Sequence, residues 1–155
     1  MLASAVLGVA TVAVVGPIMA AQQQTQAVAG VTEGLALARQ LLEEIAAKPY
    51  ADPDDGNIIR GPDAMESSRD LFDNVDDYHG YADATTAMRM LSGPVVATAA
   101  DGSKYARHVT VEYRAGPGGP AVAVGDFALV TVSVKPEKGQ EVELSGLVTR
   151  VSLRK

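Results

Sequence analysis

The 155-residue chain contains no cysteine and no tryptophan, and only 5% of its residues are aromatic. Without cysteine, the chain has no disulfide, no thiolate zinc ligand and no cysteine nucleophile. Because aromatic residues are few, the folded core must be built mainly from Val, Leu, Ile and Ala. The length suits one domain of ordinary size.

Clusters of basic residues are missing as well. Lys and Arg together number 13 against 19 Asp and Glu, which gives a net charge of −6. A nucleic-acid-binding surface needs clustered Lys and Arg to neutralise phosphates. The composition therefore argues against nucleic acid as a partner.

Catalytic signatures are also absent from the sequence. It contains no G-x-S-x-G nucleophile motif, no G-x-x-x-x-G-K-[ST] phosphate loop and no H-E-x-x-H zinc motif. Its two histidines, His79 and His108, are too few for a histidine-rich metal centre. We expect His108 on the polar side of a strand and His79 in a local hydrogen bond, and we expect no enzymatic activity.

No charged side chain occurs between Met1 and Thr32. Residues 1–21 are apolar or small throughout, and about 21 helical residues extend roughly 30 Å, the thickness of a bilayer core. A cleaved secretory signal is disfavoured, because no basic residue precedes Arg39 and no good small-x-small site lies near Ala20. A buried core helix is disfavoured, because so small a domain hardly surrounds a helix that is apolar on every side. We therefore predict a transmembrane helix over residues 1–21.

The helical pattern continues beyond this apolar run. Across residues 22–48, apolar residues recur at steps of three and four, which predicts an amphipathic spine. The spine residues predicted to pack on a sheet are Val28, Val31, Leu35, Leu42 and Ile45. Pro49 then stops the helix. The prediction is one helix of about 70 Å over roughly Leu2–Lys48, with Glu33 and Glu44 facing water.

Residues 49–94 have several prolines, many aspartates and little periodicity, which predicts an irregular acidic loop region. Ca²⁺ takes six to eight oxygen ligands, and carboxylates in such a loop supply them. The candidate calcium ligands are Asp73, Asp76 and Asp77, and a second acidic cluster comprises Asp52, Asp54 and Asp55. The spacing of the second cluster is one residue short of an EF-hand loop, so simple solvation of the loop is the favoured alternative. No other cofactor is expected.

Residues 95–155 predict an antiparallel β-sheet. Alternation with a period of two places these residues on the buried face: Tyr105, Val109, Val111, Tyr113, Ala128, Val130, Val132 and Val134. Arg107 is the polar exception on that side. Turns are predicted at 115–120 and 136–139. In the last strand the apolar residues change sides, which predicts a bulge at Gly146. The fold class is therefore α+β, a long helix packed on a small antiparallel sheet.

This layout resembles the type IV pilin superfamily, including the pseudopilins of type II secretion. Leu7-Gly8 fits the family's Leu-Gly pair, and Pro17 lies near its helix-kinking proline. The stretches LALARQLLEEIAAKPY and DDYHGY also resemble prepilin-type proteins. The residues that the resemblance assigns to the membrane and assembly helix are Leu2, Leu7, Gly8, Val14 and Pro17.

The resemblance implies a pilin-like fold and a filament subunit that takes part in protein transport and assembles through its hydrophobic helix. It implies a single-pass inner-membrane location with the C-terminal domain on the periplasmic side. The implied partners are the lipid bilayer, other pilin-like subunits, and the secretion or pilus machinery. The alternative is a membrane-anchored extracytoplasmic binding module that does not polymerise.

The family's basic leader, its Gly-Phe processing site and the acidic residue near the start of the mature chain have no counterpart in this sequence. The match at Leu7-Gly8 therefore implies that the first few mature residues precede Met1. Basic residues, a Gly-Phe pair and an acid encoded upstream would support the pilin interpretation. An ordinary basic flank alone would favour the simple anchor.

Overall fold

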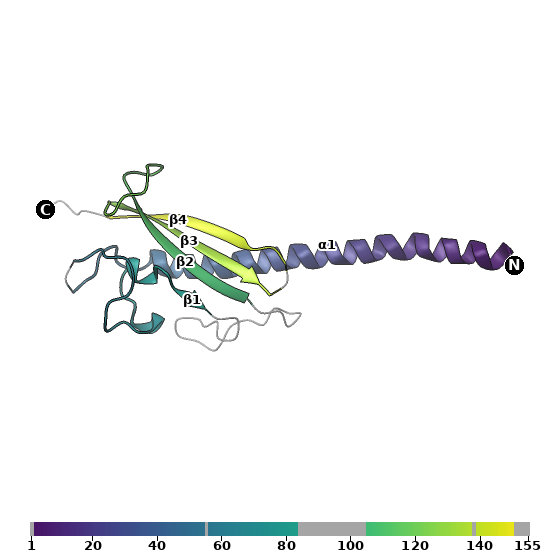
Figure 1. The fold of residues 1–155 in the computed structure, drawn as a ribbon, viewed down its shortest axis with the longest axis horizontal. Coiled ribbons are helices and arrows are strands. Elements are labelled where there is room, and N and C mark those ends of the chain that lie inside the picture. The colour runs from purple at the N-terminus through teal and green to yellow at the C-terminus, as the bar shows by residue number, and fades with distance from the viewer. Residues whose placement is uncertain (1, 55, 84–104, 138, 151–155) are drawn as a thin grey trace.

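A computed structural model shows one long helix packed on a four-stranded sheet (Figure 1). The residues that it describes are 2–54, 56–83, 105–137 and 139–150, with side chains from Gly16 onward. The helix α1 covers Leu2–Ala46, and two short 3₁₀ turns follow, η1 (Arg69–Leu71) and η2 (Asp76–Tyr78). The α+β class predicted from the sequence is confirmed.

The sheet is antiparallel throughout, in the order β1-β2-β3-β4. Its strands are β1 (Ala82–Asp83), β2 (Tyr105–Arg114), β3 (Phe127–Pro136) and β4 (Val142–Thr149). The first strand lies inside the region predicted to be irregular, because two residues are too few to show a period. The predicted turn at 115–120 is confirmed by the hydrogen bond from the Ala115 N–H to the Pro120 carbonyl, at 3.2 Å.

The helix α1 is continuous through Pro17, as the single-helix prediction requires. Its C-terminal part lies against the sheet, and its N-terminal part projects away from the sheet (Figure 1). The side chains of Leu2, Leu7, Gly8 and Val14 lie outside the described residues. Within the described part of the chain, no helix combines the length and the apolar character needed to cross a membrane.

The hydrophobic core lies between α1 and the inner face of the sheet. The helix residues buried there are Leu37, Ala38, Leu41 and Ile45, and the strand residues include Val109, Val111, Val130, Val132 and Val134. The alternation predicted for β2 and β3 is therefore confirmed. Each fully buried aliphatic side chain contributes about 1.5–3 kcal/mol, so this layer supplies most of the stability of the fold.

The predicted packing stripe of α1 is wrong in its N-terminal part. Ile45 is buried and Leu42 packs against the core, as predicted. The side chains of Val28, Val31 and Leu35 are instead 60%, 39% and 44% exposed. The buried face begins only at Gly34, which contacts the first residue of β4. Val28 and Val31 precede this point, and the helix buries the adjacent face through Leu37, Ala38 and Leu41 in place of Leu35.

Gly146 allows the helix and the sheet to approach closely, because an added Cβ would lie only 3.1 Å from Leu42 Cδ2. At Gly34 an added Cβ would lie 3.4 Å from Val142 Cγ2, an ordinary contact distance. The predicted bulge at Gly146 is wrong, because β4 pairs with β3 in unbroken register. The apolar residues of β4 do not all share one face, because Leu147 lies on the outer face of the strand, where it is 42% exposed.

We predict that truncating Leu41 destabilises the domain and that truncating Leu35 does not. Leu41→Ala removes a fully buried side chain and should lower the free energy of unfolding by about 3 kcal/mol. Leu35→Ala removes the same atoms from an exposed site and should change it by less than about 0.5 kcal/mol. Urea denaturation followed by circular dichroism measures both changes, and equal losses would contradict the observed helix face.

Candidate functional site

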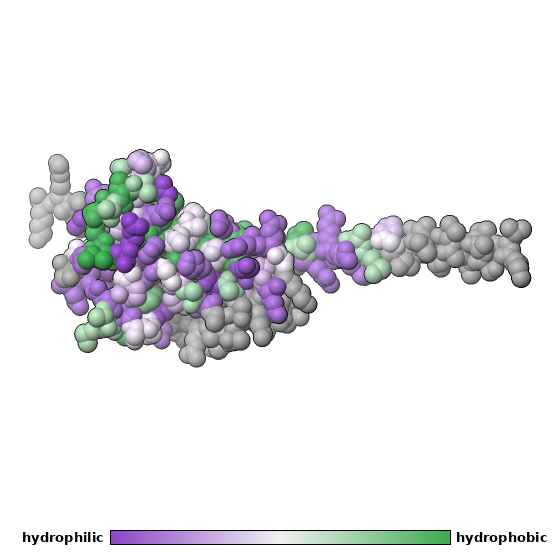
Figure 2. Space-filling view, viewed as in Figure 1, coloured by the Kyte–Doolittle hydropathy of each residue, from purple (hydrophilic) through white to green (hydrophobic). Residues whose placement is uncertain are grey.

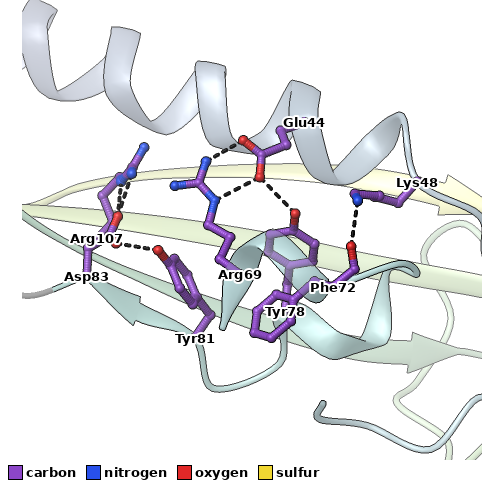
Figure 3. Close-up of polar contacts among 8 residues, drawn as sticks. All are labelled: Glu44, Lys48, Arg69, Phe72, Tyr78, Tyr81, Asp83 and Arg107. Atoms are coloured by element: carbon purple, nitrogen blue, oxygen red, sulfur yellow. Dashed lines mark hydrogen bonds and ion pairs between the residues drawn. The ribbon is translucent and has the colours of Figure 1, made fainter. Parts of the chain in front are cut away.

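The segment 69–83, which follows α1 in the chain, is fixed to the helix by a buried ion pair between Arg69 and Glu44 (Figure 3). Arg69 Nε donates to Glu44 Oε1 at 2.8 Å, and the Tyr78 hydroxyl donates to the same oxygen at 2.8 Å. The expectation that Glu44 faces water is therefore wrong, since its carboxylate points into the domain. Burial acts to raise the pKa of Glu44, but the hydrogen bonds from Arg69 and Tyr78 outweigh it and lower the pKa.

A second buried ion pair fixes the same segment to the sheet. Arg107 Nε donates to Asp83 Oδ2 at 2.7 Å, and the Tyr81 hydroxyl donates to the Asp83 carboxylate. The guanidinium of Arg69 lies 5.6 Å from the centre of the Tyr81 ring, so a cation–π contact links the two pairs. The buried polar position that the sequence showed at Arg107 is thus explained by a partner 24 residues away.

Aromatic contacts complete this attachment. The centre of the Phe72 ring lies 5.1 Å from that of Tyr78 and 5.9 Å from that of Tyr81, and both pairs pack edge to face. The ammonium of Lys48, which follows the end of α1, donates to the Phe72 carbonyl. Since breaking a buried ion pair on one side costs about 3–5 kcal/mol, the segment 69–83 is firmly positioned although its regular elements, η1, η2 and β1, are very short.

The fixed segment carries part of an acidic cluster. Two sets of carboxylates have oxygens within 4.8 Å of one another, and they are Asp52, Asp54 and Asp73, and Glu66, Asp73 and Asp77. The structure therefore brings Asp73 and Asp77 together, as the calcium hypothesis expects, and joins Asp73 to two residues of the other predicted cluster. Asp55 lies outside the described residues. Sequence reasoning missed Glu66, because no spacing rule links it to the aspartates.

The structure places Asp76 outside both sets. Its side chain is 2% exposed, and its carboxyl lies beside the Tyr113 phenol. Burial, together with the neighbouring charge of Asp77, raises the pKa of Asp76 to about 7. Asp76 is therefore a buried carboxyl of the core and not a member of the acidic cluster.

Crowding of like charges is visible in the electrostatics of the acidic cluster. Burial raises the pKa of Asp73, and the charges of Glu66 and Asp52 raise it further. Burial also raises the pKa of Glu66, with Asp77 adding to the effect. A bound cation would relieve this repulsion. Solvation of the exposed carboxylates remains the alternative.

The local hydrogen bonds of the cluster shape its loop. Asp77 Oδ2 accepts the backbone N–H groups of Asp73 and Asn74 at 2.9 and 3.0 Å. Asn74 Oδ1 in turn accepts the N–H groups of Asp76 and Asp77 at 2.8 and 3.2 Å. The Asp77 carboxylate thus holds the loop in shape, and it belongs, with those of Asp73 and Glu66, to a candidate ligand set for a cation.

His108 has the place expected for it, whereas the hydrogen bond of His79 is not local. His79 Nδ1 accepts the N–H of Val111 at 3.1 Å, which joins the acidic region to β2 across 32 residues of the chain. His108 is exposed on the outer face of β2.

A second candidate site is the exposed face of α1. Apolar side chains outside the core occur on the helix at Ile18, Met19, Val28, Val31 and Leu35. Figure 2 shows hydrophobic surface on the projecting part of the helix, interrupted by hydrophilic side chains. Apolar groups left in water along a helix are available for contact with another apolar surface.

In comparisons with known proteins, no family model matches the chain, and no curated protein or solved structure shows significant similarity to it. The two sites therefore have to be interpreted from their own geometry.

We predict that Ca²⁺ stabilises the protein through the acidic cluster. Millimolar Ca²⁺ should raise the melting temperature, because a ligand that binds only the folded state stabilises it by mass action. Mg²⁺ should have a smaller effect, since it requires stricter octahedral geometry. Asp73→Asn should abolish the shift, whereas Asp70→Asn, an exposed site outside the cluster, should preserve it. Identical melting curves in Ca²⁺ and in chelator would leave solvation as the explanation.

We predict that stability falls as the pH rises from about 4 to about 7. The pKa of Asp76 is raised in the folded state, so the unfolded chain loses this proton first, near pH 4, and ionisation in the folded state follows only near pH 7. The free energy of unfolding should drop by up to about 4 kcal/mol over this range. Asp76→Asn should flatten the profile and Asp70→Asn should not. Parallel wild-type and Asp76→Asn profiles in pH-dependent urea denaturation would contradict the prediction.

Proposed function

We propose that this chain is a pilin-like structural subunit of a type II secretion or type IV pilus-type filament. In this proposal, residues 1–21 insert into the inner membrane and the sheet domain lies on the periplasmic side. Assembly with other pilin-like subunits then proceeds through the N-terminal helix. The uncharged, apolar sequence of residues 1–21 supports the bilayer as a partner.

The single observation that carries the proposal is the long helix that the sheet covers only in its C-terminal part (Figure 1). An isolated helix gains little stability from its own hydrogen bonds, so a projecting helix with apolar side chains is best stabilised by packing against other helices. Gly16 and Gly30 have open space where a Cβ would stand. Small residues of this kind allow helix backbones to approach closely.

A membrane-anchored binding module is the second candidate function. The acidic cluster favours it, because the cluster provides carboxylates for a cation, and two of them, Asp73 and Asp77, lie on the segment 69–83 that the buried ion pairs fix to the domain. In this alternative, residues 1–21 act only as a tether, and the exposed face of α1 makes no contact between subunits. The two candidates thus differ in whether Val28 has a neighbouring copy within reach.

We predict that single cysteines on the apolar helix face crosslink in membranes. The chain has no native cysteine, so Val28→Cys and Ala29→Cys each provide one thiol on the full chain. With a short bis-maleimide, Val28→Cys should give crosslinked dimers. Ala29→Cys points about 100° away around the helix and should give far fewer. Immunoblots of carbonate-washed membranes measure the dimer fraction.

Two outcomes would contradict this proposal. Loss of the full chain from carbonate-washed membranes would show that residues 1–21 do not anchor it. Equal and low crosslinking at the two positions would favour the module that does not polymerise.

A further inference from the structure

The two edges of the sheet differ in whether another segment of the chain pairs with the edge strand. Segment 79–83 covers the β2 edge, where β1 pairs with the strand and His79 accepts the N–H of Val111. On the other side, β4 pairs only with β3 among the residues that the structure describes. Among the described residues, the sheet therefore has one covered edge and one edge with no strand beside it, and β4 forms that second edge (Figure 1).

The hydrogen-bonding groups of the open edge can be assigned. The Arg150 N–H donates to the Asp126 carbonyl at 2.9 Å, so even-numbered residues of β4 direct their N–H and C=O groups toward β3. The backbone groups of Glu143, Ser145 and Leu147 therefore point away from the sheet. Open edges are usually blocked by Lys, Pro or a bulge. Among its described residues, β4 has none of these.

A groove continues this edge. It has a volume of about 440 Å³ and lies between the end of α1 and the end of β4, and its lining residues are Ala46, Lys48, Tyr50, Ala51, Val148, Thr149 and Arg150. Thr149 and Val148 belong to both the strand and the groove, so a strand added to β4 leads directly into the groove. Two cations, Lys48 and Arg150, lie at this end, whereas Glu141 and Glu143 lie at the other end of the edge.

A second copy of this chain does not suit the edge. Two identical β4 edges pair antiparallel about a two-fold axis perpendicular to the sheet, which directs their α1 helices in opposite directions. Two copies anchored in one membrane have parallel helices, and their β2 edges are covered. This step rests on the proposed function, because it uses the common membrane orientation of the helices.

We propose that the open edge of β4 binds an extended segment of a different protein as an added strand. An acidic side chain of that segment lies at Lys48 and Arg150, and a basic one lies at the end occupied by Glu141 and Glu143. Backbone hydrogen bonds supply affinity in such strand addition, and the charges at the two ends supply direction and specificity.

The test uses the full chain in detergent micelles and fluorescein-labelled peptides of eight residues. The peptides alternate Thr and Val with Lys at one end and Glu at the other, and they are made in both sequence directions. Fluorescence anisotropy should show that one direction binds more tightly than the other. Ser145→Pro removes an outward N–H and should weaken binding about tenfold or more, whereas Ser145→Thr should bind like the wild type.

Charge reversal provides the second variant. Arg150→Glu should weaken the peptide ending in Glu and strengthen a peptide with Lys at both ends. The melting temperature of each variant establishes that it is folded. Wild-type affinity in Ser145→Pro and Arg150→Glu, or no binding by either peptide, would overturn the proposal. Self-association of the chain that Ser145→Pro abolishes would also overturn it, since the edge would then bind a second copy.

The peptide-binding test and the crosslinking test of the filament proposal can fail independently. Crosslinking at Val28→Cys should persist in a Ser145→Pro chain, because the helix face and the β4 edge are different surfaces. Peptide binding without crosslinking would overturn only the filament. Crosslinking without peptide binding would overturn only strand addition.

Discussion

The matched buried charges of segment 69–83 determine how the rest of the domain is arranged. Arg69 pairs with Glu44 of the helix, and Asp83 pairs with Arg107 of the sheet. A buried ion left without its partner is unfavourable by several kcal/mol, so helix, segment and sheet have to come together in one arrangement. That arrangement sets the position of the acidic cluster and covers one edge of the sheet.

Local periodicity predicted the long elements α1, β2 and β3, because it depends on residues that are close together in the sequence. The continuous helix and the buried alternation of β2 and β3 follow from it. The pairing of Arg107 with Asp83 depends on residues far apart in the chain, and no local pattern indicates it. The prediction that Leu35 packs on the sheet is wrong for a similar reason, since the extent of the sheet decides which helix residues it covers.

The candidate cation site was also predicted only in part from the sequence. Aspartate density pointed to Asp73 and Asp77, but only the folded chain adds Glu66 and separates Asp76 from them. Composition cannot distinguish a carboxyl that faces a loop from one that faces a tyrosine in the core. The acidic surface of the domain and its apolar helix face thus lie on different elements, one in the loop region and the other on the projecting helix.

The close approach of Leu42 to Gly146 has a mechanical consequence. Leu42 Cδ2 lies 3.1 Å from the position that a Cβ at residue 146 would take, so this side chain packs closely on β4 where the glycine leaves room. Axial displacement of α1 would drive this side chain against the neighbouring part of the strand. Tension applied to the projecting helix would therefore reach β4 through this contact, and the rest of the sheet through the hydrogen bonds of β4.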